Sequence, residues 1–178
     1  MPKCLSIGFA TWILLAGCTS MSVQTDYSED VDFSAFETFQ YEESDRSLAD
    51  VAPLAHQRIG AAIRRGMTDS GLAEVESGPD LHVTYYASTS EQLQFQTTYM
   101  GVGGWGRWGR RGRVGVAGST TRATTYEQGT LVIDIWQAEE NRLVWRGVVT
   151  DTLSGNPDRN TDKINRGVAR AFEGFPPS

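Results

Sequence analysis

Cysteine is nearly absent from this chain, and both copies lie close to the start. The 178 residues contain only Cys4 and Cys18, so no thiol follows position 18. This excludes a disulfide framework, a redox pair and a cysteine metal site for the rest of the chain. Histidine is equally rare, and His56 and His82 do not make a ligand set for zinc. Stability must therefore come from a packed core, for which 39% hydrophobic residues with five tryptophans suit one domain of ordinary size.

The apolar run near the start is too short to span a membrane. It covers residues 5–16, whereas a transmembrane helix needs roughly 20 apolar residues. The run follows Lys3 and ends in small residues directly before a thiol, Leu15-Ala16-Gly17-Cys18. This order predicts a lipoprotein signal peptide over residues 1–17, cleaved before Cys18. The alternatives are an ordinary secretory signal that ends near a cysteine, or a buried apolar N-terminus.

Lipidation of Cys18 predicts where the protein works. The Cys18 thiol would accept a diacylglycerol, and two or more acyl chains anchor a protein stably because each buried methylene contributes about 0.8 kcal/mol. The next residue is Thr19. By resemblance to lipoproteins of Gram-negative bacteria, an Asp there would favour the inner membrane. We therefore expect residues 18–21 to form a short tether, and the protein to be anchored in the outer membrane and to face the periplasm.

Acidic residues are missing from one long segment of an otherwise acidic chain. The formal net charge is -6, yet no acid lies between Glu91 and Glu127. Within that segment, residues 101–118 contain eight glycines. Because glycine at this density makes ordering expensive, we expect residues 101–118 to form a mobile loop between two strands. The acidic balance of the whole argues against general adhesion to nucleic acid.

The same loop is a candidate surface-binding site. Arginine offers bidentate contacts to phosphate and tryptophan favours the membrane interface, and the loop carries both: Trp105, Arg107, Trp108, Arg110, Arg111 and Arg113. In a cytoplasmic protein this segment would resemble an RNA-contacting one. Because we expect the protein to be exported, we do not expect a nucleic-acid partner. We expect anionic lipid headgroups or an envelope protein as the partner. The alternative is a hairpin tip whose arginines merely balance the acidic N-terminal segment.

The remaining residues 22–178 predict a single α+β domain, an antiparallel-rich sheet with two helices packed on one face. Strand patterns cover residues 22–27, 33–41, 81–88, 129–137 and 142–152. Apolar residues recur at helical spacing over 55–67, with Asp50 as a possible N-cap, Pro53 in the first turn and Gly71 as the stop. A final helix is expected after residues 158–161, with Gly174 beyond its end.

The last two strand patterns predict a hairpin with a defined register. Placing Ile133 and Ile135 on one face with Leu143 and Trp145 requires a loop with an odd number of residues. A loop of residues 139–141 meets this condition. In this register Asp134 lies opposite Arg146 on the other face.

Several motifs in a fixed order resemble a known family. The order runs from the segment before Cys18 through Asp32-Phe33 and Thr38-Phe39, Pro79-Asp80-Leu81, the glycine and tryptophan-rich insertion, Gly129-Thr130-Leu131 with Asp134, Trp145-Arg146-Gly147, and Phe175-Pro176-Pro177. The chain resembles the bacterial lipoproteins of the domain-of-unknown-function family 4136 over nearly its whole mature length. The resemblance implies a periplasm-facing lipoprotein with one small α+β domain. It brings no catalytic residue, cofactor or ligand.

Catalytic and metal motifs are weak. Gly101, Gly103 and Gly106 have the spacing of a dinucleotide loop, but no helix follows them. Residues 158–162 have the alternate spacing of a calcium loop, but Lys163 takes its glycine position, so we expect Asp158, Asn160 and Asp162 to cap the final helix. We expect His56 and His82 to be ordinary surface or satisfied histidines.

Two functions of different class follow from the sequence. The favoured one is a non-catalytic binding or structural module of the envelope, with neither cofactor nor metal. The alternative is a periplasmic hydrolase with an unrecognised active site. A cleft that gathers at least two titratable groups with shifted pKa values would favour the enzyme.

Overall fold

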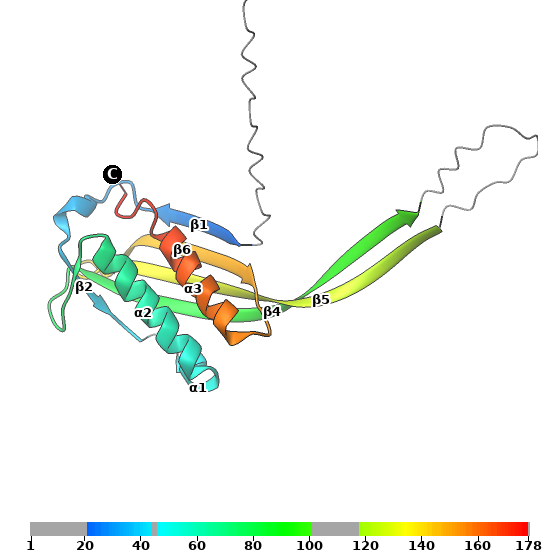
Figure 1. Cartoon of the computed structure of the whole chain (residues 1–178). Coiled ribbons are helices and arrows are strands. Elements are labelled where there is room, and N and C mark those ends of the chain that lie inside the picture. Colours follow the sequence, from blue (N-terminus) through cyan, green and yellow to red (C-terminus); the bar gives the residue numbers. More distant parts are fainter. Residues whose placement is uncertain (1–20, 44–45, 101–117, 178) are drawn as a thin grey trace, which may run out of the picture.

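The computed structural model describes residues 21–43, 46–100 and 118–177, and Figure 1 shows their arrangement. The elements in chain order are β1 (Ser22–Tyr27), the 3-10 turn η1 (Phe33–Ala35), β2 (Thr38–Tyr41), α1 (Arg46–Val51), α2 (Pro53–Asp69), β3 (Ala73–Glu74), β4 (Leu81–Met100), β5 (Gly118–Gln137), β6 (Arg142–Thr152) and α3 (Pro157–Ala171).

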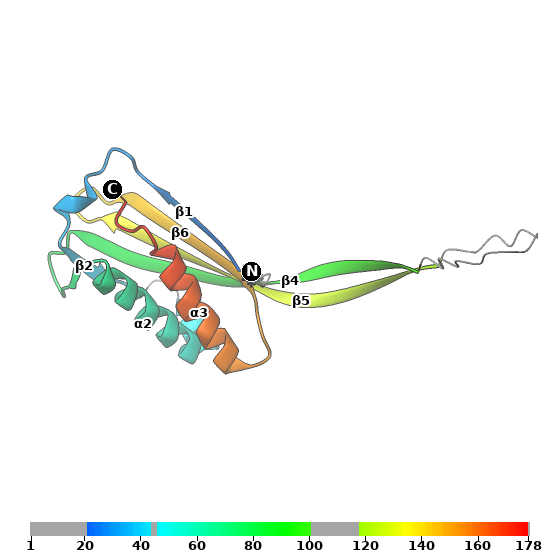
Figure 2. The ribbon, with the colours of Figure 1, turned by 45° about the horizontal axis from the view of Figure 1, so that its top comes forward.

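The strands form one six-stranded mixed sheet in the order β1-β6-β5-β4-β2-β3. The short β2 runs parallel to β3 and β4, and the other neighbours are antiparallel. Helices α2 and α3 lie next to each other across one face of this sheet (Figures 1 and 2). The α+β class expected from the sequence is confirmed.

The β5–β6 hairpin has the expected pairing at its centre. Asp134 pairs with Arg146, and Arg146 Nε and Nη2 donate hydrogen bonds of 2.6 and 2.7 Å to the two carboxylate oxygens of Asp134. Ile133 is fully buried and Trp145 is 3% exposed. Both therefore point into the helix-covered core, while the ion pair lies on the opposite face.

The predicted loop of this hairpin was wrong. Gln137 pairs with Arg142, so the turn has four residues, 138–141, and not three. Ile135 pairs with Trp145 while Trp136 pairs with Leu143, so Val144 is the extra residue of a β-bulge. The bulge supplies the odd residue that the alternation needs. As a result Val144 is buried, at 1% exposure, and Leu143 is only half-buried.

Helix α2 buries the expected stripe against the sheet. Ile59, Ala62, Ile63 and Met67 are all buried. Pro53 occupies the first turn as predicted, and the chain turns at Gly71 with a φ of 93°. The proposed N-cap was wrong, because Asp50 belongs to the preceding helix α1 and the capping position is Ala52, which makes no side-chain cap.

Helix α3 begins earlier than expected. Asn156 is its N-cap and accepts a hydrogen bond of 2.9 Å from the Asp158 backbone N–H. Asn160 does not cap the helix; its amide group bonds both backbone groups of Ser154 and so closes the loop before α3. Pro157 explains the early start, since its fixed φ suits the first helical position.

An aromatic cluster fills the core under the C-terminus. The Trp145 ring stacks on Phe172 at 5.4 Å and meets Phe175 edge-on at 5.4 Å between centroids. Two glycines make this approach possible. A Cβ at Gly147 would lie 2.5 Å from the Trp145 ring, and one at Gly66 would lie 2.6 Å from Phe172. The Trp-Arg-Gly motif therefore packs a ring over its own strand.

Asp80 joins β2 to the start of β4. Its carboxylate accepts hydrogen bonds from the Glu37 N–H at 3.0 Å, the Thr38 N–H at 2.9 Å and the Thr38 hydroxyl at 2.7 Å. The parallel pairing of Phe39 with Leu81 begins next to this contact. The Pro-Asp-Leu motif thus fixes the register of a short parallel strand.

The main departure from expectation is the length of β4 and β5. The sequence predicted strands over 81–88 and 129–137, but the paired strands continue to Met100 and begin at Gly118. Residues 91–100 and 118–127, hereafter the ribbon, extend well beyond the body of the domain (Figures 1 and 2). The expected loop 101–118, apart from Gly118, lies outside the described residues.

Candidate functional site

The ribbon continues the core-facing side of β4 after the core has ended. Leu81, Val83 and Tyr85 are buried, and Leu93 and Phe95 follow at the same alternation. Leu93 is 65% exposed and Phe95 is 68% exposed. They pair across the ribbon with Thr125 and Ala123. This side of the ribbon, hereafter its apolar face, therefore presents two large hydrophobic side chains to solvent.

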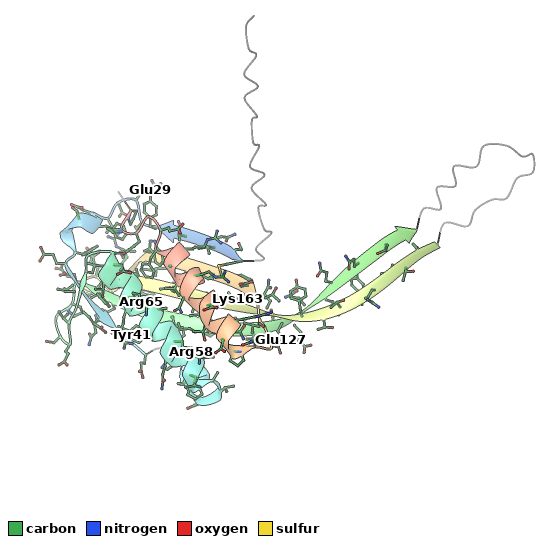
Figure 3. All side chains as sticks on the ribbon, in the orientation of Figure 1. Glu29, Tyr41, Arg58, Arg65, Glu127 and Lys163 are labelled. Carbon is green, nitrogen blue, oxygen red and sulfur yellow. The ribbon has the colours of Figure 1, made fainter. Side chains whose placement is uncertain are left out.

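Two carboxylates stand where the ribbon joins the sheet. Glu91 and Glu127 are direct cross-strand partners on the apolar face, and both are exposed. Figure 3 shows Glu127 at this junction. Like charges placed opposite each other destabilise an isolated strand pair. The junction is thus a local negative site at the edge of an otherwise uncharged face.

An open apolar cavity lies next to the junction, over the sheet and between α2 and α3. Its volume is about 430 Å³, within the range of about 300 to 1,000 Å³ that is usual for binding pockets. The lining is mostly hydrophobic and includes Val51, Ala55, Ala87, Leu131, Val149 and Ile164. Val51 and the nearby Leu54 add exposed apolar surface on the helical side, at 85% and 61% exposure.

The charged groups of the cavity are already engaged with each other. Lys163, labelled on α3 in Figure 3, lies 3.3 Å from the Asp151 carboxylate and donates a hydrogen bond of 2.5 Å to the Thr152 carbonyl. Asp151 also accepts from the Thr152 N–H at 2.7 Å. A ligand of this cavity would therefore be recognised by apolar contact and shape.

Each histidine lies next to a polar side chain of the domain. His56 is buried on α2, and its Nδ1 is hydrogen-bonded to the Tyr85 hydroxyl on the buried side of β4. His82 lies on the other side of β4, where its Nδ1 is 2.8 Å from the Glu42 carboxylate. Neither lines the cavity.

The pKa shifts of four residues are explained by their hydrogen bonds or burial. The Glu37 N–H and the Thr38 hydroxyl hold the pKa of Asp80 below its usual value. Burial raises the pKa of Tyr41 to about 12, although the Arg64 guanidinium, 3.9 Å from its ring centroid, acts in the opposite direction. Hydrogen bonds from Ser28 and Ser34 lower the pKa values of Asp30 and Asp32. None of these four residues lines the cavity.

The binding residues predicted from the sequence lie outside the described residues. This applies to Cys18 and to the loop residues Trp105, Arg107, Trp108, Arg110, Arg111 and Arg113. Sequence reasoning missed the ribbon and the cavity. The sequence did contain a signal for the ribbon. Leu93 and Phe95 alternate with glutamines before the loop, and a threonine-rich stretch precedes Tyr126 at a similar distance after the loop.

Within residues 21–43, 46–100 and 118–177, no group of three or more His, Cys, Asp or Glu residues is placed to hold a metal ion. Among the helices in these ranges, none combines the length and hydrophobicity needed to cross a membrane.

Fold and surface together define a small α+β domain with an apolar cavity in its body and a β-ribbon that projects away from it. The chain belongs to the DUF4136 family, a domain of unknown function whose model matches residues 23–177. The family expected from the sequence motifs is confirmed. No curated protein sequence matches the chain.

Three solved structures are similar in fold. A PDZ domain protein from Parabacteroides distasonis has a TM-score of 0.57 at 16% identity, and the match covers 89% of this chain but 37% of that one. The PelC dodecamer from Paraburkholderia phytofirmans has a TM-score of 0.44 at 8% identity, over 85% and 97% of the two chains. A minor lipoprotein from Acinetobacter baumannii has a TM-score of 0.43 at 7% identity, over 78% and 91%. At these identities the likeness concerns the fold alone.

Proposed function

We propose that the protein is a lipid-anchored envelope lipoprotein of the outer membrane, facing the periplasm, that acts as a non-catalytic binding module. In this function the sheet and its two helices are the scaffold, and the ribbon carries the binding segment away from it. The observation that carries the proposal is the ribbon itself. Each ribbon strand has ten residues counted from the junction, which gives a shaft of about 30 Å at about 3.3 Å per residue.

The position of the N-terminus supports this proposal. Strand β1 starts at the end of the sheet from which the ribbon departs (Figures 1 and 2). The tether of residues 18–21 spans at most about 3.6 Å per residue. A lipid on Cys18 would therefore hold this end of the domain close to the headgroups, and the ribbon would start on the membrane side of the domain.

The chemistry of the segment that joins the two ribbon strands favours an anionic target. Arg107, Arg110, Arg111 and Arg113 occur there without an acid, together with Trp105 and Trp108. Near an anionic leaflet each arginine contributes roughly 1 kcal/mol, and this attraction declines over a Debye length as salt rises. Anionic lipid headgroups are therefore the favoured target, with an acidic envelope protein as the second.

Vesicle binding tests this function. The domain from Thr19 to Ser178 is compared with a variant in which Arg107, Arg110, Arg111 and Arg113 are replaced by Ser. The parent should bind anionic vesicles at low salt and lose binding at high salt, and the variant should bind much more weakly at both.

A matched control removes the same charge from the body of the domain. Arg65, Arg159, Arg166 and Arg170 are exposed on α2 and α3, and their replacement by Ser should change binding little. Equal binding by the parent and the loop variant, or binding by neither, would contradict the lipid target and leave a protein partner.

A further inference from the structure

The apolar face of the ribbon lacks a covering layer. Within the body, buried residues of β4 and β5 share one core with those of α2 and α3, but neither helix extends over the ribbon (Figure 2). Leu93 and Phe95 are consequently exposed on a two-stranded hairpin. Such a hairpin is at best marginally stable alone and needs a packing partner for its hydrophobic side. A ribbon of this length therefore needs another surface to cover its apolar face.

A surface of matching character exists on the same chain but out of the ribbon's reach. The cavity between α2 and α3 is apolar and open, and its charged groups, Lys163 and Asp151, are engaged with each other. The ribbon points away from α2 and α3 (Figures 1 and 2), and none of its residues lines the cavity. We propose that the ribbon of one copy packs its apolar face, with Leu93 and Phe95, into the cavity of a second copy.

The distribution of acidic residues favours contact between the ribbon of one copy and the body of another over contact between two bodies. All 22 acidic residues lie outside residues 92–126, and the net charge of the chain is -6. Two bodies therefore repel each other, whereas the ribbon carries no acid beyond the junction. Its arginine, Arg122, pairs with Gln96 and lies on the face opposite Leu93 and Phe95. The receiving side is acidic at its rim, with the exposed Asp50 next to Val51 and with Glu91 and Glu127 at the junction. The uncharged apolar face can therefore approach this acidic rim without like-charge repulsion.

The same carboxylates decide the symmetry of the contact. Consider a two-fold symmetric dimer in which Phe95 of each copy lies over Ala87 of the other. Phe95 and Ala87 are each four residues from Glu91, so Glu91 would lie at the centre of the contact. Glu91 and Glu127 of both copies would then face each other, and like charges brought together oppose association. A head-to-tail contact avoids this meeting. Head-to-tail contacts between copies generate a ring if they close and a filament if they do not.

Disulfide trapping tests the contact directly, because no cysteine follows position 18. The full chain with Phe95→Cys is mixed with the full chain with Val51→Cys, and mild oxidation should give a mixed disulfide. Gln94→Cys with Val51→Cys is the matched control, since Gln94 is the exposed neighbour of Phe95 on the opposite face. The parent chain alone reports any crosslink through Cys4 or Cys18.

The expected result is a several-fold higher yield of mixed disulfide with Phe95→Cys than with Gln94→Cys. Equal yields in the two mixtures, or no crosslink in either, overturn the proposal. A dominant disulfide between two copies of the Phe95→Cys variant, joined at position 95, also overturns the proposal, because that product requires two ribbons to meet.

Sedimentation provides a measurement without introduced cysteines. The wild-type chain should sediment above the monomer mass of 19.6 kDa, and Phe95→Ser should return it to the monomer. The melting temperature of the single copy should not change in Phe95→Ser, because the Phe95 side chain is 68% exposed within one copy. Gln94→Ser should leave the assembly intact. A wild-type chain that remains monomeric at the highest concentration of the series overturns the proposal.

Discussion

Trp145 is the side chain that links the sheet to the C-terminal aromatic cluster. It is 3% exposed and contacts Phe172 and Phe175. We expect Trp145→Ala to lower the free energy of unfolding by about 3 to 5 kcal/mol, because the ring leaves a large cavity between the strand and α3. Urea denaturation monitored by far-UV circular dichroism measures this change.

The neighbouring Arg146 is the control for that experiment. Its pair with Asp134 has short, bidentate contacts, but the arginine side chain is 47% exposed. Arg146→Ala should therefore cost no more than about 1 kcal/mol. Equal losses in the two variants would contradict the burial assigned to the tryptophan.

Asp80 makes stability depend on acid pH. The hydrogen bonds from Glu37 and Thr38 hold its folded-state pKa below the unfolded value, which is about 3.9. A depressed folded pKa stabilises the protein fully above the unfolded pKa, and the contribution is lost as pH falls through the folded pKa. The free energy of unfolding should therefore fall as pH is lowered below about 4.

Asp80→Asn is the variant that isolates this contribution. Its amide oxygen still accepts hydrogen bonds but does not titrate, so the decline below the unfolded pKa should be shallower than in the wild type. The measurement is denaturant unfolding over a pH series, and parallel profiles for the two proteins would show that Asp80 is not the group responsible.

At the scale of elements, the start of α3 gives a sharp test of helix capping. Asn156 accepts from the Asp158 N–H, whereas Asp162 lies within the helix. Asn156→Ala should cost about 1 kcal/mol, the usual value for a lost N-cap. Asp162→Ala should be nearly neutral. Thermal unfolding of the two variants in parallel checks the order.

The elements that the sequence predicted well are those whose hydrophobic period is buried on one side. Ile59, Ile63 and Met67 mark α2, and the alternation around Ile133 and Trp145 marks the β5–β6 hairpin. In each case local pattern and tertiary burial agree, so the period in the sequence reports the buried face.

Where prediction failed, a tertiary contact decided the outcome. The bulge at Val144 is invisible to an argument that assumes strict alternation, because one extra residue restores the phase after a longer turn. The ribbon was missed because its hydrophobic residues, Leu93 and Phe95, are few and lie among glutamines and threonines. The cavity has no linear signature, since its lining comes from α1, α2, α3 and three strands.

At the scale of the whole molecule, the proposed anchoring depends on one residue. Cys18→Ser should abolish the acyl mass on the N-terminal peptide and move the protein from the membrane fraction to the soluble fraction. The variant is exported on an ordinary cleavable secretory signal, so that an uncleaved leader does not retain it. Mass spectrometry and fractionation measure the two effects separately, and membrane retention without acylation would contradict lipid anchoring through Cys18.

The place of β1 in the sheet determines how a pull on the N-terminus is borne. β1 is an edge strand, and its six residues pair antiparallel with β6 from Ser22 to Tyr27. The hydrogen bonds of an antiparallel pair run perpendicular to the strands. Tension applied at Ser22 along the strand axis therefore loads the whole row in shear, and no bond breaks ahead of its neighbours. An anchor attached at that end can restrain the domain mechanically without peeling its edge strand away.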